Sequence, residues 1–226
     1  MLGLSISDLP FIIMSVAIVL VATVLHEVAH AAAANALGDP TAKERGRLTL
    51  NPMAHLHPVG SIVLPLLMAI AGGPIFAFAN PVPYNPNRLR NPIRDEVLVA
   101  LAGPACNLVQ ALVGAGIFRL LYAALPQAGG NADLMVFVLQ ILSRYVYLNL
   151  MLMFFNLIPL PPLDGSAVIS PFLRGKARDW YYEVQRYALP VLLGIMYLVP
   201  MVLHINPVGI YLDYTAGNLA PVLLGI

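Results

Sequence analysis

Long apolar runs, separated by short polar segments, dominate the pattern of hydrophobic and polar positions along the chain. Four of the runs reach the length of about 20 residues that a membrane-spanning helix needs. They cover residues 9–37, 94–125, 134–157 and 184–203. Two other apolar segments are interrupted, residues 61–79 by proline and glycine and residues 207–226 by polar side chains. The pattern predicts an all-α polytopic membrane protein with a three-helix core and extra transmembrane helices.

The composition supports this class. Hydrophobic residues make up 59% of the chain and charged residues 10%, whereas roughly 25% of a soluble domain is charged. The first apolar run lacks a basic leader and continues through His26 and His30, so we expect it to stay in the mature protein. The net charge of +1, without a run of lysine or arginine, indicates no nucleic-acid partner. Cys106 is the single cysteine, which excludes an intramolecular disulfide.

Basic residues indicate the topology, because lysine and arginine are retained on the cytoplasmic side of membrane spans. They flank residues 61–79 on both sides, at Lys43, Arg45, Arg47, Arg88, Arg90 and Arg94. If both flanks are cytoplasmic, residues 61–79 enter the membrane and return to the same side, a path that suits their proline and glycine breaks. We therefore predict a re-entrant segment there, and a first helix that runs from outside to inside.

The polar segments between the apolar runs leave no room for an inserted soluble domain. We predict that residues 1–226 form one transmembrane domain, with a core over about residues 9–165 and C-terminal helices over about residues 166–226. Arg144 fits this pattern poorly, because it is a cation in the middle of the third run. Two interpretations stay open: the side chain faces the bundle interior and pairs with an acid, or the span begins later in the sequence.

The sequence LHEVAH, residues 25–30, puts three ionisable side chains inside the first predicted span. His26 and His30 are four residues apart, so in a helix both imidazoles project from one face and can bind adjacent corners of a tetrahedral zinc ion. Glu27 is placed to hold a zinc-bound water and to take its proton. Histidines that merely bond neighbouring helices are the structural alternative. Ionisable residues inside membranes are usually functional, which favours the metal.

A catalytic zinc ion commonly has three protein ligands and one open position, so a third ligand must come from elsewhere in the chain. Asp164 follows the prolines that break the third run, where helix-broken backbone must line a cavity or be buried. Spacing alone leaves two interpretations of Asp164 open, a metal ligand and a cap of the next helix. His55 and His57 are rival ligands, although their polar, proline-bounded surroundings favour a surface loop. His204 lies at the far end of the fourth run and is set aside.

Three motifs together resemble the site-2 protease family of intramembrane zinc metalloproteases. They are HEVAH, AGPACN at residues 102–107 and NLIPLPPLDG at residues 156–165, and the resemblance covers about residues 20–165. It implies one Zn²⁺ per chain, held by His26, His30 and Asp164, with Glu27 as the catalytic base. It also implies that Asn156 stabilises the oxyanion, a role that a side-chain amide can serve.

The resemblance extends to residues around these motifs. Gly103 allows close helix approach, and Asn107 matches a family position for which an interhelical hydrogen bond is the favoured interpretation. The segments GRLTLNP and FANPVPYNP, which include Leu48 and Pro83, look like the family's membrane-associated strand and loop elements. We hypothesise that residues 47–50 or 80–85 hold a substrate in extended form by β-augmentation, since a helix hides its peptide bonds.

The sequence thus predicts a zinc metalloprotease that hydrolyses peptide bonds within or near transmembrane segments of protein substrates. We expect a multi-pass protein of the cell membrane, in contact with the lipid bilayer, with its active site towards the cytoplasm and no PDZ or CBS domain. A membrane metal-binding or transport protein is one alternative, but it needs more acidic or histidine residues across the bilayer. A non-catalytic homologue that binds clients is the other. The sequence specifies neither a particular substrate nor an oligomeric state.

Overall fold

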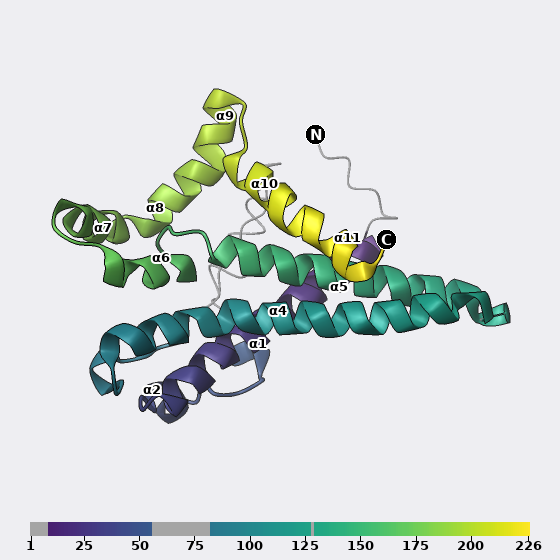
Figure 1. The fold of residues 1–226 in the computed structure, drawn as a ribbon, viewed down its shortest axis with the longest axis horizontal. Coiled ribbons are helices and arrows are strands. Elements are labelled where there is room, and N and C mark those ends of the chain that lie inside the picture. The colour runs from purple at the N-terminus through teal and green to yellow at the C-terminus, as the bar shows by residue number, and fades with distance from the viewer. Residues whose placement is uncertain (1–8, 56–81, 128) are drawn as a thin grey trace. The chain divides into compact units, whose positions relative to one another are not determined.

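The computed structural model describes residues 9–55, 82–127 and 129–226, and Figure 1 shows its ribbon. The chain divides into two compact units, Met1–Gly103 and Pro104–Ile226. The all-α class is confirmed, because the regular elements of the described residues are helices. Within these residues, three helices are long and apolar enough to cross a membrane: Ile12–Ala36, Pro92–Gln127 and Gly129–Asn156.

The first unit contains the helix that carries the HEVAH sequence. Its elements are α1 (Leu9–Ala36), α2 (Thr41–Glu44), the short 3-10 turns Pro52–Ala54 and Pro86–Arg88, and the start of α4 (Pro92–Ala124). Helix α4 begins with Pro92, whose missing N–H costs nothing at a first helical position. In the first turn, the buried carboxylate of Asp95 accepts a hydrogen bond of 2.8 Å from the backbone N–H of Asn91. This bond fixes where α4 starts.

The second unit is built on two long helices. Its elements are the rest of α4, α5 (Ala132–Asn156), α6 (Asp164–Ile169), α7 (Lys176–Arg186), α8 (Ala188–Leu193), α9 (Val199–Leu203), α10 (Pro207–Leu212) and α11 (Asn218–Leu224), with π-helical turns at Gly194–Leu198 and Asp213–Gly217. Figure 1 shows α4 and α5 side by side, with the run from α10 to α11 along α5. Small residues at the contact, such as Ala111, Ala115, Ala216 and Ala220, let the backbones approach closely.

A buried polar network joins α4 to α5 in the second unit. The side-chain amide of Asn107 donates to Asn149 over 3.2 Å, and Asn149 donates in turn to the carbonyl of Tyr145 over 2.9 Å. The Tyr145 hydroxyl donates to Gln110 over 2.8 Å. Asn107 and Asn149 are fully buried. Asn107 therefore makes an interhelical hydrogen bond, the role that the sequence favours for it.

Arg119 and Arg144 lie well inside the second and third predicted spans. Arg119 of α4 donates two bonds of 2.7 Å to the carbonyls of Val222 and Leu223 at the end of α11. It satisfies carbonyls that a helix end leaves without an internal partner. Arg144 is exposed on α5, which begins at Ala132. The start of the helix does not fix where the membrane span begins, so a later start of the span stays a prediction.

Other predictions on local structure have mixed outcomes. The fourth apolar run lies in α7–α9, where Asp179–Arg186 and Ala188–Leu203 meet at an angle of 83°. Residues 207–226 are helical, whereas the re-entrant segment predicted at 61–79 lies outside the described residues. The strand predicted at 47–50 is wrong, because residues 48–50 form bends. Bonds between Arg47 and the Ala54 carbonyl, and between His55 and the Thr49 carbonyl, fold this loop back on itself.

Candidate metal centre

The two histidines of helix α1 face each other through their Nε2 atoms. These atoms lie 3.0 Å apart, and the rings meet edge to face with centroids 4.6 Å apart. His26 is buried within a helix that is mostly apolar. Zinc–nitrogen bonds of about 2.0–2.1 Å at a tetrahedral angle put two ligand nitrogens about 3.3 Å apart. The pair therefore fits two corners of a zinc site with little adjustment.

The other ring nitrogen of His30 is held by helix α4. His30 Nδ1 lies 2.7 Å from the carbonyl oxygen of Val99. A carbonyl can only accept, so Nδ1 carries the proton and donates, which leaves the lone pair of the neutral ring on Nε2. Histidines that bind metals commonly have such a partner for the second nitrogen, because it fixes the tautomer and the ring orientation. Val99 thus prepares His30 Nε2 as a ligand atom.

Gly103 keeps the space beside both ligand atoms open. A Cβ atom at this position would overlap Nε2 of His30 and both Cε1 and Nε2 of His26. Gly103 lies one turn after Val99 on α4, so one helix face both orients His30 and makes room for the imidazoles. The close approach predicted for Gly103 is thus an approach of α4 to the two imidazole rings of α1.

Glu27 is bound by a backbone group from a distant part of the sequence. Its Oε2 atom accepts a hydrogen bond of 3.0 Å from the N–H of Val82. Residues 82–85 have no regular secondary structure, and Pro83 lines a cavity of about 360 Å³ whose wall also includes Thr41, Tyr84 and Arg88. The segment that starts at Val82 therefore lies directly beside the candidate base.

Asp39 anchors the other end of this segment. Its Oδ2 accepts a bond of 2.5 Å from the Asn85 N–H, and its Oδ1 accepts one of 3.0 Å from the Thr41 N–H. Burial disfavours the charged form of Asp39, but these two bonds and one from the Thr41 hydroxyl outweigh it. The nearby charge of Arg88 acts in the same direction, so the pKa of the Asp39 carboxyl lies below its ordinary value.

The remaining predicted residues belong to the second unit. Asp164 is the first residue of α6, and the N-cap position before it is Leu163, so Asp164 is not the cap that one interpretation makes it. A Cβ on Gly165 would overlap the carbonyl of Leu157, so glycine lets α6 start against the end of α5. Asn156, the last residue of α5, donates one amide hydrogen to the Leu152 carbonyl over 3.0 Å.

The structure thus brings His26, Glu27, His30 and Gly103 together in the first unit, and it holds Asn156 and Asp164 at the ends of adjoining elements of the second. Their joint roles in one site stay a prediction. His55 is buried with Nε2 at 2.8 Å from the Thr49 carbonyl, and His57 lies outside the described residues.

Sequence reasoning missed Val99, Val82 and Asp39. Val99 contributes a backbone carbonyl and Val82 a backbone N–H, groups that do not depend on the side chain. Asp39 could have been noticed as the acid of the Gly-Asp-Pro turn, residues 38–40, which directly follows the HEVAH helix.

Curated proteins that are similar to the chain carry zinc metalloprotease names. "Putative zinc metalloprotease YwhC" of Bacillus subtilis (strain 168) is 36% identical over 209 residues, which are 91% of this chain and 84% of that protein. "Putative zinc metalloprotease Rip2" of Mycobacterium tuberculosis (strain ATCC 25618 / H37Rv) is 33% identical over 181 residues, which are 80% of this chain and 65% of that protein. Rip2 of Mycolicibacterium smegmatis is 31% identical over 183 residues, which are 81% and 63% of the two chains.

The chain therefore spans most of the Bacillus relative but less than two thirds of each mycobacterial one. No family model matches the chain, and no solved structure gives a significant match.

Proposed function

The chain belongs to the site-2 protease family, together with YwhC and Rip2, and from this premise we propose that it is an intramembrane zinc metalloprotease. It hydrolyses peptide bonds within or near transmembrane segments of membrane proteins. The observation that carries the proposal is the His26–His30 pair, whose Nε2 atoms lie 3.0 Å apart inside an apolar helix with Glu27 next in sequence to His26.

The proposed ligand set is His26, His30 and Asp164, with one Zn²⁺ per chain. Asp164 is favoured because a carboxylate oxygen suits zinc and because the N-cap position of α6 belongs to Leu163. His55 stays the rival ligand, because the contact of its Nε2 with the Thr49 carbonyl leaves Nδ1 as the atom that could bind a metal. Zinc, when bound, supplies a Lewis acid and lowers the pKa of a bound water towards about 7.

The protein's own groups move the protons and stabilise the charge. Glu27 accepts a proton from the attacking water and passes it to the nitrogen of the leaving amine. Asn156 has a second amide hydrogen beyond the one that it donates to Leu152, and this N–H can donate to the oxygen of the scissile carbonyl. Asn156 therefore serves as the proposed oxyanion donor.

The segment from Val82 to Asn85 is the proposed contact for the substrate backbone. It lies against Glu27 and is anchored by Asp39, whereas residues 48–50 are bent and offer no straight edge. A locally extended substrate bound along this segment would pass beside the base. Pro83 lies within the segment and is therefore a proposed substrate contact. Leu48 is exposed in the loop of residues 47–55 and is kept as a second candidate contact.

The proposed location is the cell membrane, with several spans and the active site towards the cytoplasm. The support is the set of basic residues on both sides of residues 61–79, because such residues are retained on the cytoplasmic side.

Zinc content of the full chain, purified in detergent, tests the ligand set. Elemental analysis is expected to find about one zinc per chain, with severe loss in His26→Ala and in Asp164→Ala. His55→Gln serves as the matched control and is expected to keep its zinc. Full retention by Asp164→Ala would move the third ligand elsewhere, and a chain without zinc after supplementation would end the protease proposal.

Cleavage of a transmembrane reporter substrate tests the role of Glu27 separately. Glu27→Gln is expected to keep the metal and to lose cleavage by roughly a hundredfold to ten-thousandfold. Equal cleavage by this variant and the unaltered chain would remove Glu27 as the base.

A further inference from the structure

Helix α7 is amphipathic along its whole length. Apolar or aromatic residues recur at spacings that place them on one face of a helix. They are Ala177, Trp180, Tyr181 and Val184. Charged residues with the corresponding spacing occupy the other side of the helix. They are Lys176, Asp179, Glu183 and Arg186.

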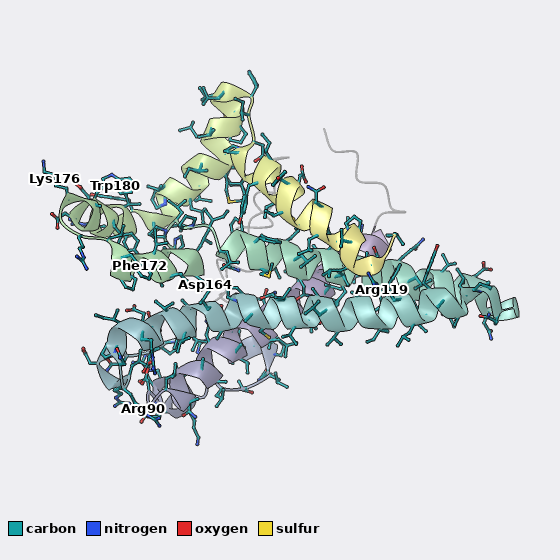
Figure 2. The ribbon with its side chains drawn as sticks, in the orientation of Figure 1. Arg90, Arg119, Asp164, Phe172, Lys176 and Trp180 are labelled. Carbon is teal, nitrogen blue, oxygen red and sulfur yellow. The ribbon has the colours of Figure 1, made fainter. Side chains whose placement is uncertain are left out.

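Among the described residues, one edge of the apolar face is covered by protein and the other is exposed. Tyr181 is buried, and its hydroxyl donates to the Ser166 carbonyl of α6 over 3.2 Å. Trp180, the next residue along the face, is 65% exposed. Phe172 in the turn before α7 is 78% exposed, and Tyr187 directly after it is 54% exposed. Figure 2 marks Phe172, Lys176 and Trp180 in this part of the second unit.

The direction of α7 suits a helix that lies flat on a membrane. Asp179–Arg186 and the apolar run Ala188–Leu203 meet at 83°. The run exposes Leu198, Met201 and Leu203, as a segment in contact with lipid tails would. If the run is inserted along the membrane normal, α7 lies close to the membrane plane.

We infer that α7 is an in-plane helix that binds the interface of the lipid bilayer, with Trp180 and its aromatic neighbours inserted at the headgroup level. Tryptophan and tyrosine prefer this depth because their rings have an apolar body and a polar tip. Residues 174–186 carry four basic and two acidic side chains, so the partner surface is one that contains anionic lipid.

The contact between Tyr181 and Ser166 links the membrane-binding helix α7 to helix α6. Ser166 is two residues after Asp164 in α6, so this bond holds α7 against α6 close to Asp164. Lipid bound to α7 would therefore restrain the element that begins with Asp164. The inference itself does not depend on the proposed enzymatic function.

Trp180 is the single tryptophan of the chain, so the tryptophan emission of the whole protein reports on α7. The experiment uses the full chain in vesicles of phosphatidylcholine and phosphatidylglycerol. Brominated lipids, which quench from within the bilayer, are compared with iodide, which quenches from water. We expect brominated lipid to remove most of the emission and iodide to remove little of it.

Two references calibrate the result. N-acetyltryptophanamide in buffer gives the response of an indole in water. The double variant Trp180→Phe, Phe137→Trp moves the tryptophan to an exposed position of the span α5 and gives the response of an indole among lipid tails. Brominated lipid is expected to quench Trp180 to an extent close to that of the second reference.

Two results would overturn the inference. Iodide quenching of Trp180 as strong as that of the free indole would place α7 in water. Protection from both quenchers that disappears as protein is diluted in lipid would show that a second copy of the chain covers the face. Circular dichroism of each variant shows that the helices are intact, so that neither result can be ascribed to misfolding.

Discussion

The Nδ1 nitrogen of His30 lies 2.7 Å from the carbonyl oxygen of Val99, which joins the HEVAH helix to the first turns of α4. This bond selects the tautomer of His30 that offers Nε2, the atom that faces His26. Metal binding at this pair therefore depends on how α4 approaches α1 in the first unit, as well as on the two histidines. The approach is made possible by Gly103, which lies one turn further along α4.

Replacement of Gly103 by alanine is expected to abolish or severely weaken zinc binding. The new Cβ would overlap both Nε2 atoms, so either the imidazoles or α4 must shift, and both moves break the geometry of the ligand pair. The measurement is zinc content together with the zinc dissociation constant of the full chain in detergent.

Gly116→Ala is the matched control for this substitution. Gly116 lies on the same helix, and a Cβ there would have nothing within 4 Å. Alanine is favoured over glycine in a helix by roughly 0.5–1 kcal/mol, so the control is expected to keep its zinc and to lose no stability. Equal zinc binding by the two variants would show that α4 does not constrain the histidine pair.

Replacement of Gly165 by alanine is expected to destabilise the start of α6. The Cβ would overlap the Leu157 carbonyl and press on the Ile158 carbonyl, and backbone atoms cannot move aside as a flexible side chain can. Hydrogen exchange of residues 157–170 should accelerate in this variant. Gly194→Ala, where the added Cβ has no neighbour within 4 Å, should leave exchange in that segment unchanged.

How far the sequence predicts the site depends on the kind of group involved. The shared face of His26 and His30 follows from helical periodicity, which holds for any long apolar run. The partners of these residues do not follow from it, since Val99 acts through a carbonyl and Val82 through an N–H that all residues except proline have. Asp39 acts on Asn85, which is 46 residues away in sequence, so only the fold shows that they meet.

The errors in local structure have a similar origin. The sequence GRLTLNP has extended character, yet its loop is closed by side-chain bonds to the carbonyls of Ala54 and Thr49, and such bonds compete with strand pairing. The role of Arg119 does not follow from the sequence, because its partners are carbonyls at the end of α11, which it reaches only once that helix has docked.

A double-mutant cycle on Asn107 and Asn149 is expected to show a favourable coupling of about 0.6 kcal/mol, the average for interhelical hydrogen bonds in membranes, and at most about 1.7 kcal/mol. The two side chains are fully buried and lie within hydrogen-bond distance, so either alanine substitution alone disturbs a polar network between α4 and α5. Unfolding of the full chain in mixed detergent micelles measures each free energy. Strictly additive single substitutions would show that the bond does not stabilise the helix pair.

Asp39 should make the first unit sensitive to acid. The pKa of its carboxyl is lowered in the folded chain, so the folded state gains stability above the ordinary aspartate value of about 3.9 and loses it as the pH falls through the lower folded value. The melting temperature of the full chain should therefore decline below about pH 4.

In Asp39→Asn the melting temperature should be lower at neutral pH but decline less over the same acid range, because the charged acceptor of the Asn85 and Thr41 bonds is already lost. Glu44→Gln, which removes only an exposed ion pair with Arg88, is the control and should follow the unaltered chain. Parallel curves for Asp39→Asn and the unaltered chain would show that another group causes the acid sensitivity.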